Sequence, residues 1–158
     1  ILLNHAPPFC ETWEGGYYDG EEELRNHLVP VMEEYGVDLC ISGHAHTYER
    51  GIPHPPYNPA TGEGNTVSYL VSGGGGSQLD NRKYREWPQI DIPPHAVDPN
   101  PDPLINDIGE YYRYHFCEIK AEKHRLECIA HWVRTDGTIV DTLDSFILRK
   151  GIAHRGQP

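Results

Sequence analysis

The chain has 158 residues, of which 37% are hydrophobic and 23% charged, which is enough for one globular domain with a core. A formal net charge of −11 argues against binding to nucleic acid or to an anionic membrane surface, because those partners need clustered Lys and Arg. The charge does not exclude a small phosphate ester, since a bound divalent cation can dominate the local field.

The first third of the chain predicts a strand and then a helix. Residues 1–3 are apolar and read as a short buried strand. The segment 21–36 predicts an amphipathic helix, in which Pro30 should kink or split the backbone and Gly36 should cap the end. The helical spacing gives this helix one apolar face, formed by Leu24, Leu28, Val31, Met32 and Tyr35.

Two further apolar strands are expected at 37–41 and 67–71, and the second runs into the sequence SGGGGS. Because the run at 67–71 is continuous rather than alternating, we expect this strand to be buried on both faces. Residues 77–108 follow, with six prolines between positions 88 and 103. This composition predicts a long loop insertion rather than regular structure.

The last part of the chain predicts an antiparallel meander. The dipeptide Asp136-Gly137 is a strong hairpin signal, and a second turn is expected at 121–124. The expected strands are 111–119, 125–133 and 138–148. A strand–helix–strand–strand unit followed by a meander favours an α/β sandwich, with a few parallel strands in its first half.

The four cysteines, at 10, 40, 117 and 128, form no CxxC pair, and their spacing does not fit a zinc finger. Cys117 and Cys128 are expected to face each other across the predicted hairpin. They are either two buried thiols or a disulfide, and the sequence leaves both readings open.

Histidines follow the predicted strands where those strands end. His5 comes after the first strand, and the pair His44 and His46 comes after the second. If the strands are parallel neighbours, these side chains converge on the sheet edge where ligands bind in α/β folds. Imidazole is a common metal ligand near neutral pH, and in an extended loop His44 and His46 could reach two ions about 3.5–4 Å apart. The other seven histidines read as surface or core residues.

Four segments, LLNHAPP, LRNHLVPVMEEYGVDLCISGHAHTYER, SYLVSGGGG and DGTIVDTLDSF, resemble successive pieces of the calcineurin-like metallophosphoesterases. The resemblance is closest to the purple acid phosphatase-like branch, in which a GHxHxYER motif follows a strand. It implies that residues 1–158 are the C-terminal portion of one metallophosphoesterase domain, and that the whole domain holds two ions of Fe, Zn or Mn. It further implies that His5 and His44 bind one ion, that His46 binds the other, and that the phosphate ester lies across both.

The GDxx(D/Y) and GNH(D/E) motifs of that family do not occur in this chain, and no DxH or DxG motif stands ahead of His5. We therefore expect a longer parent protein that carries them in an N-terminal half of the same domain, and we expect this chain to be inactive alone. No catalytic side chain is assigned. Tyr17 and Arg50 are candidate substrate-binding residues, although Tyr17 could equally pack in the fold and Arg50 could pair internally.

The sequence leaves two rival functions to consider. The chain could be a non-catalytic module that binds phosphate groups or a protein partner, with residues 77–108 as its recognition loop. An amidohydrolase also uses an HxH metal pair, but it would need far more than the roughly 110 residues that follow the pair here. The sequence assigns no compartment, and secretion is suggested only by analogy.

Overall fold

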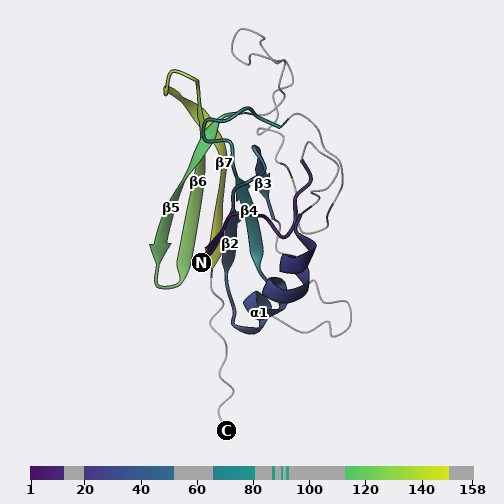
Figure 1. The fold of residues 1–158 in the computed structure, drawn as a ribbon. Helices are drawn as coiled ribbons and strands as arrows, with labels where there is room; N and C mark the ends of the chain where they lie inside the picture. Colours follow the sequence, from purple (N-terminus) through teal and green to yellow (C-terminus); the bar gives the residue numbers. More distant parts are fainter. Residues whose placement is uncertain are drawn as a thin grey trace.

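The computed structural model describes residues 1–12, 20–51, 66–80, 87, 90, 92 and 113–149. Two sheets lie against each other as two layers (Figure 1). One sheet has the order β1-β2-β4-β3, and the other has the order β5-β6-β7. The elements of the first sheet are β1 (Leu2–Asn4), β2 (Leu39–Ser42), β3 (Tyr48–Arg50) and β4 (Ser68–Ser72). Those of the second are β5 (His115–Glu122), β6 (Arg125–Val133) and β7 (Ile139–Arg149).

The first sheet, here named the parallel sheet, contains the expected parallel strands. β1 pairs in parallel with β2, and β2 pairs in parallel with β4, so Leu3, Ile41 and Leu70 lie side by side across the sheet. β4 is buried from Ser68 to Val71, as its continuous apolar sequence predicts. β3 pairs antiparallel with β4, and the sequence did not predict it because it is a three-residue strand of polar and aromatic residues.

The second sheet is the expected antiparallel meander. β6 begins and ends where the sequence places it, and Gly137 has the positive φ of 85° that the Asp-Gly turn requires. The pairing of β6 with β7 shifts register twice, opposite Leu143 and Val140. The predicted α/β class, with a few parallel strands, a helix and a meander, is confirmed.

The helix is split, as Pro30 predicts. A π-helical turn, η1 (Leu24–Leu28), precedes α1 (Val29–Glu34), and the N–H of Val29 donates to the carbonyl of Leu24 five residues back. Pro30 has no N–H for a carbonyl one turn back, and the wider turn lies just before it.

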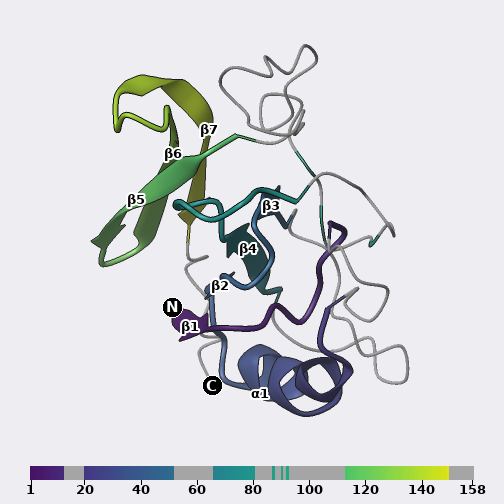
Figure 2. The same ribbon diagram turned by 45° about the horizontal axis from the view of Figure 1, so that its top comes forward.

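The predicted apolar face of this helix is buried at Met32 but not at Val31 and Tyr35, which are exposed. Val29 and Glu33, which the prediction did not place on that face, are buried. The extra residue of the π turn rotates the side chains that follow it by about 100° around the helix axis. Each buried position after the turn is therefore shifted by one residue along the sequence. The helix packs below the parallel sheet, beside β1 and β2 (Figure 2).

The two layers share a core. Leu39, Tyr48 and Leu70 of the parallel sheet pack against buried residues of β6 and β7, namely Cys128, Ala130 and Leu143. On the other face of the parallel sheet, the helix contributes Val29 and Met32 to a second cluster, which also contains Phe9, Cys40, Val67, Tyr69 and Ile90. The parallel sheet is therefore covered on both faces, which leaves its carboxyl edge as the place where polar side chains gather.

All four cysteines are free thiols. Cys117 lies opposite Ala130, and Cys128 lies opposite Ile119, so the two cysteines are diagonal rather than direct neighbours on β5 and β6. Diagonal positions are about 7–8 Å apart between backbones, which is too far for an unstrained disulfide. Of the two readings of this pair, the structure supports the two thiols.

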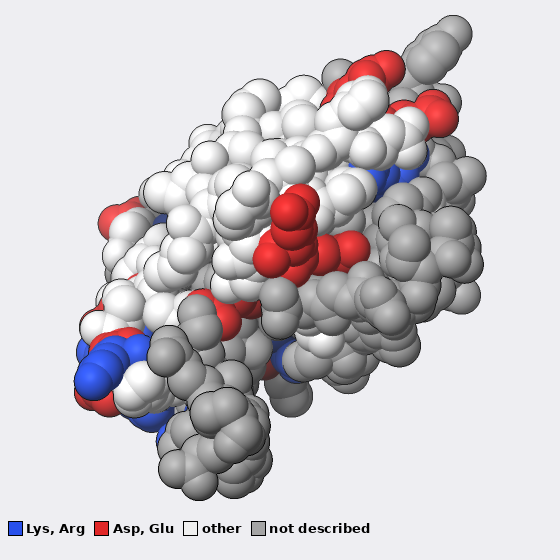
Figure 3. Space-filling view, turned by 90° about the horizontal axis from the view of Figure 1, so that it is seen from below, with Lys and Arg blue, Asp and Glu red and all other residues white. Residues whose placement is uncertain are grey.

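No helix in the described ranges is long and apolar enough to cross a membrane. Among the described residues on the face shown in Figure 3, most are uncharged, and a small group of acidic side chains lies near the centre of the view. Of the predicted insertion at 77–108, the structure describes residues 77–80, 87, 90 and 92. The rest of that insertion and Tyr17 lie outside the described residues.

Candidate metal centre

Parallel pairing places the ends of β1, β2 and β4 at one edge of the sheet. His5 follows β1 there, and His44 follows β2. Nδ1 of His44 lies 2.9 Å from Nε2 of His5, and the ring centroids are 4.8 Å apart in an edge-to-face arrangement. One of the two nitrogens donates a proton to the other, so the pair shares one hydrogen bond.

The backbone at His44 has an unusual conformation. Its φ is 66°, the one positive value among the non-glycine residues that the structure describes. The N–H of Ala45 donates to the carbonyl of Gly43 at 2.8 Å, so His44 is the central residue of a γ-turn of the rare, positive-φ kind. The N–H of Gly43 donates to the carbonyl of His5 at 3.1 Å, which ties this turn to the end of β1.

The expectation of an extended loop around His44 and His46 is therefore wrong. The chain must pass from β2 to β3, which lies on the far side of β4, within five residues. It does so by bending at residues 44–47. Strained backbone of this kind clusters at functional sites, where the surrounding structure holds it in place.

His46 is held by the loop that follows β4. Its Nδ1 lies 2.6 Å from the carbonyl oxygen of Gln78, which can only accept, so Nδ1 carries the proton and the lone pair is on Nε2. The backbone N–H of His46 donates to Oδ2 of Asp80 at 2.7 Å, and the N–H of Asp80 donates to the carbonyl of His46 at 3.1 Å. These three bonds fix the tautomer and the position of His46, as partners of metal-binding histidines commonly do.

The environment of His44 favours its neutral form. Partial burial lowers the pKa of His44, and positive charge on His5 or on His46 lowers it further. Neutral imidazole is the form that binds a metal ion, because the ligand nitrogen must keep its lone pair. The same crowding of imidazoles that disfavours protonation would favour a divalent cation.

Glu49 of the GHAHTYER segment has a buried structural position that the sequence did not reveal. Its carboxylate accepts the N–H of Glu11 at 2.8 Å and that of Thr12 at 3.0 Å, as well as the hydroxyl of Thr12. The thiol of Cys10 lies 3.4 Å from the same carboxylate. Burial raises the pKa of Glu49 to about 7, although these donors oppose the rise. Glu49 thus anchors residues 10–12 to β3.

Arg50 forms an ion pair within the fold. Its Nε lies 2.6 Å from Oδ2 of Asp144 on β7, and the hydroxyl of Tyr48 donates to the same oxygen at 2.9 Å. The guanidinium also lies over the ring of Phe146. Internal pairing, one of the two expectations for Arg50, is what the structure contains. Substrate binding by Arg50 stays a prediction, and so does that by Tyr17.

The donor set suits a metal of the zinc or iron type, because imidazole nitrogens are the ligands these ions prefer. His5, His44 and His46 supply such nitrogens at one sheet edge, with the tautomer of His46 already fixed. Within the described part of the chain, however, no group of three or more His, Cys, Asp or Glu side chains is arranged to hold an ion. These residues therefore fit as part of a coordination shell rather than as a complete one.

Comparisons with known proteins agree with the resemblance, although no protein-family model matches the chain. Purple acid phosphatase 1 of Ipomoea batatas is 33% identical over 87 residues, and phosphoenolpyruvate phosphatase of Allium cepa is 34% identical over 86. A protein described as probable inactive purple acid phosphatase 1, from Arabidopsis thaliana, is 31% identical over 86 residues. Each match covers 49% of this chain but only 14–18% of the relative.

Solved structures show the same fold at low sequence identity. Purple acid phosphatase PPD1 from yellow lupin seeds matches 95% of this chain with a TM-score of 0.57 and 19% identity. GAP50, the anchor in the inner membrane complex of Plasmodium, matches 93% with a TM-score of 0.50 and 17% identity. This chain covers 24% and 35% of those two chains, respectively.

The fold is thus similar to a part of a purple acid phosphatase. The resemblance to the purple acid phosphatase-like branch is confirmed, over about half of the chain in sequence and nearly all of it in fold.

Proposed function

We propose that this chain is the C-terminal portion of a two-metal phosphoesterase that hydrolyses phosphate mono- or diesters. The observation that supports the proposal most is the 2.9 Å contact between His5 and His44, two residues 39 positions apart in the chain. Sequence similarity to two named phosphatases supports the reaction class. The partner is a small phosphate ester.

In this proposal His5 and His44 hold one ion and His46 holds the other, with iron, zinc or manganese as the candidate metals. When bound, two such ions activate a water molecule and neutralise charge on the phosphoryl oxygens. The chain's own residues orient the ligands. Gln78 keeps the proton on Nδ1 of His46, and Asp80 holds its backbone. Tyr17 and Arg50 are candidate contacts for the ester, but Arg50 would first have to leave Asp144.

The remaining ligands are proposed to come from the N-terminal half of the same domain, so this chain alone should be inactive. The test is hydrolysis of 4-nitrophenyl phosphate with added Zn²⁺, Mn²⁺ or Fe, by this chain and by the longer parent protein. We expect turnover only from the parent. Replacing His46→Ala in the parent should lower turnover by orders of magnitude, whereas His124→Ala, in the exposed turn between β5 and β6, should not. Normal turnover by the His46 variant would overturn the metal assignment.

A second candidate is a non-catalytic module that binds phosphate groups or a protein. It is favoured by the incomplete ligand set of the described residues, and one relative is itself described as probably inactive. Metal analysis of the parent protein separates the two candidates. Two bound ions with phosphatase turnover support the enzyme. A parent protein with neither bound metal ions nor phosphatase turnover supports the binding module.

A further inference from the structure

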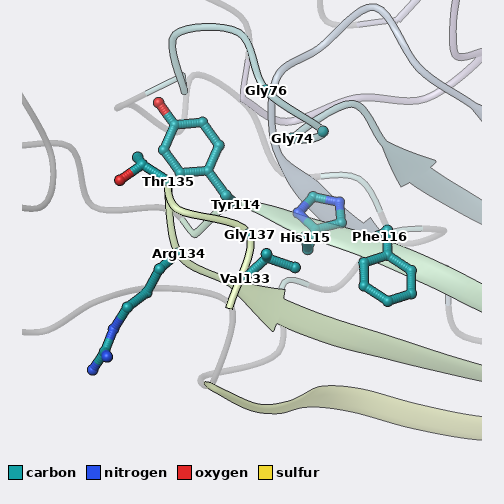
Figure 4. A pocket seen from close by; sticks show the side chains of 10 residues that line it. Gly74, Gly76, Tyr114, His115, Phe116, Val133, Arg134, Thr135 and Gly137 are labelled. Atoms are coloured by element: carbon teal, nitrogen blue, oxygen red, sulfur yellow. The ribbon is translucent and has the colours of Figure 1, made fainter. Parts of the chain in front are cut away.

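A pocket lies between the loop that follows β4, the start of β5 and the turn that joins β6 to β7 (Figure 4). Its volume of about 380 Å³ falls within the range of small-molecule sites. None of the three histidines of the candidate metal centre lines it. The pocket is therefore a separate feature from that centre.

The pocket walls are uncharged. Tyr114, Phe116 and Val133 supply aromatic and apolar surface. Among the lining residues, all of which the structure describes, only Arg134 is a Lys, Arg, Asp or Glu, and its side chain extends away from the other lining side chains (Figure 4). Such walls suit a neutral ligand better than a phosphate or a carboxylate.

His115, which also lines the pocket, is held in its neutral form. Its Nδ1 lies 3.0 Å from the carbonyl of Arg113, and its Nε2 lies 3.1 Å from the hydroxyl of Ser72. Because the carbonyl can only accept, Nδ1 carries the proton and Nε2 accepts from Ser72. Burial lowers the pKa of His115. The ring therefore adds a neutral aromatic edge to the pocket.

The glycines of the wall are not all explained by the fold. A Cβ on Gly74 would lie 2.6 Å from the ring of His115, and Gly76 has a φ of 145°, so these two positions need glycine. Gly75 has neither constraint from the residues that the structure describes, because a Cβ there would meet none of their atoms within 4 Å and its φ lies outside the left-handed region. Neither the packing of the described residues nor the backbone conformation requires glycine at 75, yet any larger residue there would take up free space beside the pocket.

We propose that this pocket binds an uncharged planar ring, as in a phenol or a nucleoside base. Tyr114, Phe116 and Val133 would contact the ring, and the backbone of Gly75 would approach it closely. Aromatic side chains favour flat rings through stacked and edge-to-face contacts, and the absence of a side chain at 75 leaves room for one.

The glycine wall of the pocket belongs to the same loop as residues that support the histidine turn, although those residues do not line the pocket. Gly73 packs directly against the carbonyl of Ala45, and Gln78 and Asp80, further along the same loop, hold His46. The binding itself requires neither a metal ion nor phosphatase activity, so it can fail or succeed independently of the proposed function.

The test is an NMR titration of this chain with adenosine and with phenol, with cyclohexanol as a non-aromatic control of matched size. We expect the two aromatic compounds to shift the amide signals of Gly74, Gly75 and Thr135, and we expect cyclohexanol to bind at least about tenfold more weakly, a difference of 1.4 kcal/mol. Equal binding of phenol and cyclohexanol, or shifts confined to residues outside the pocket, would overturn the proposal.

Two variants sharpen this test. Gly75→Leu fills the space beside the pocket and should weaken the binding of phenol at least about tenfold. Ser145→Leu adds the same side chain at an exposed position of β7 and should leave binding unchanged. If Gly75→Leu does not give a folded spectrum, Thr135→Phe narrows the pocket from the opposite wall and should cause the same loss. Unchanged binding of phenol by the folded variant contradicts the proposed site.

Discussion

The parallel and antiparallel sheets of this protein differ in burial and in the kind of residue they place at their edges. β4 of the parallel sheet is buried at four of its five positions, whereas β5 and β7 alternate between covered and exposed residues. The parallel sheet therefore leaves its carboxyl edge for chemistry, and His5, His44 and His46 follow its strands there. The antiparallel sheet covers one face of the parallel sheet. It also supplies Asp144, which binds Arg50 and Tyr48 across the layers.

The histidine edge also depends on contacts from residues outside β1 and β2, the two strands that His5 and His44 follow. Asp80 and Gln78 hold His46 from the loop after β4, and Glu49 holds residues 10–12 from β3. If this view is right, substitutions that break these supports should be more harmful than substitutions of equal size on the open face of the antiparallel sheet.

The largest expected effect is that of Gly73→Ala. A Cβ at this position would overlap the carbonyl of Ala45, which is backbone and cannot rotate away. We expect the free energy of unfolding to fall by about 3 kcal/mol, measured by urea denaturation. An unchanged denaturation midpoint would mean that the two loops are not packed as described.

The second largest effect is expected for Asp144→Ala, which removes the carboxylate that Arg50 and Tyr48 share. Because the Asp144 side chain is only 11% exposed, we expect a loss of about 2–3 kcal/mol in urea denaturation. The matched control is Glu118→Ala, which removes an exposed pair with Lys120 and should leave the midpoint nearly unchanged. Equal effects of the two substitutions would argue against a coupling between the sheets.

Glu49 should make stability depend on pH. Its pKa is raised from 4.5 to about 7 by burial, so the folded state binds more protons than the unfolded state between these values. Stability should therefore decrease as pH rises from about 4.5 to about 7, and the contribution should be constant above that. Glu49→Gln, with a neutral amide of the same shape, should flatten this part of the curve of denaturation midpoint against pH. A variant with the same curve as the wild type would show that Glu49 does not titrate in this window.

The smallest effect is expected at Gly75, two residues from Gly73. Gly75→Ala places a methyl group where no atom of the described part of the chain lies within 4 Å and where φ is not left-handed. Alanine restricts the unfolded chain, so we expect a gain of about 0.5 kcal/mol in thermal or urea unfolding. A loss of stability as large as that of Gly73→Ala would remove the contrast between these two positions of the glycine run.

The sequence predicted the parts of this fold that local patterns determine. β6 was placed correctly because turn residues flank it on both sides, and β4 was recognised as buried because its apolar run is continuous. The phase of the helix beyond Leu28 was not predicted, because a π turn adds a residue that periodicity cannot reveal. β3 was missed because three residues carry too little pattern.

The candidate site was predicted in its histidines but not in its supports. His5, His44 and His46 stood out because each follows a predicted strand. Asp80 and Asp144 had no such signal, because their roles depend on contacts 34 and 94 or more positions away in the chain. Glu49 could have been suspected from the GHAHTYER segment, but only the fold brings Glu11 and Thr12 to its carboxylate.

The most direct measurement is an NMR titration of this chain with Zn²⁺, in which the signals of the histidine ring nitrogens are followed. The account predicts that the ring signals of His5, His44 and His46 shift on binding, while those of His115, His124 and His131 do not. Shifts confined to the latter three histidines, or no change at His5 and His44, would contradict the metal centre.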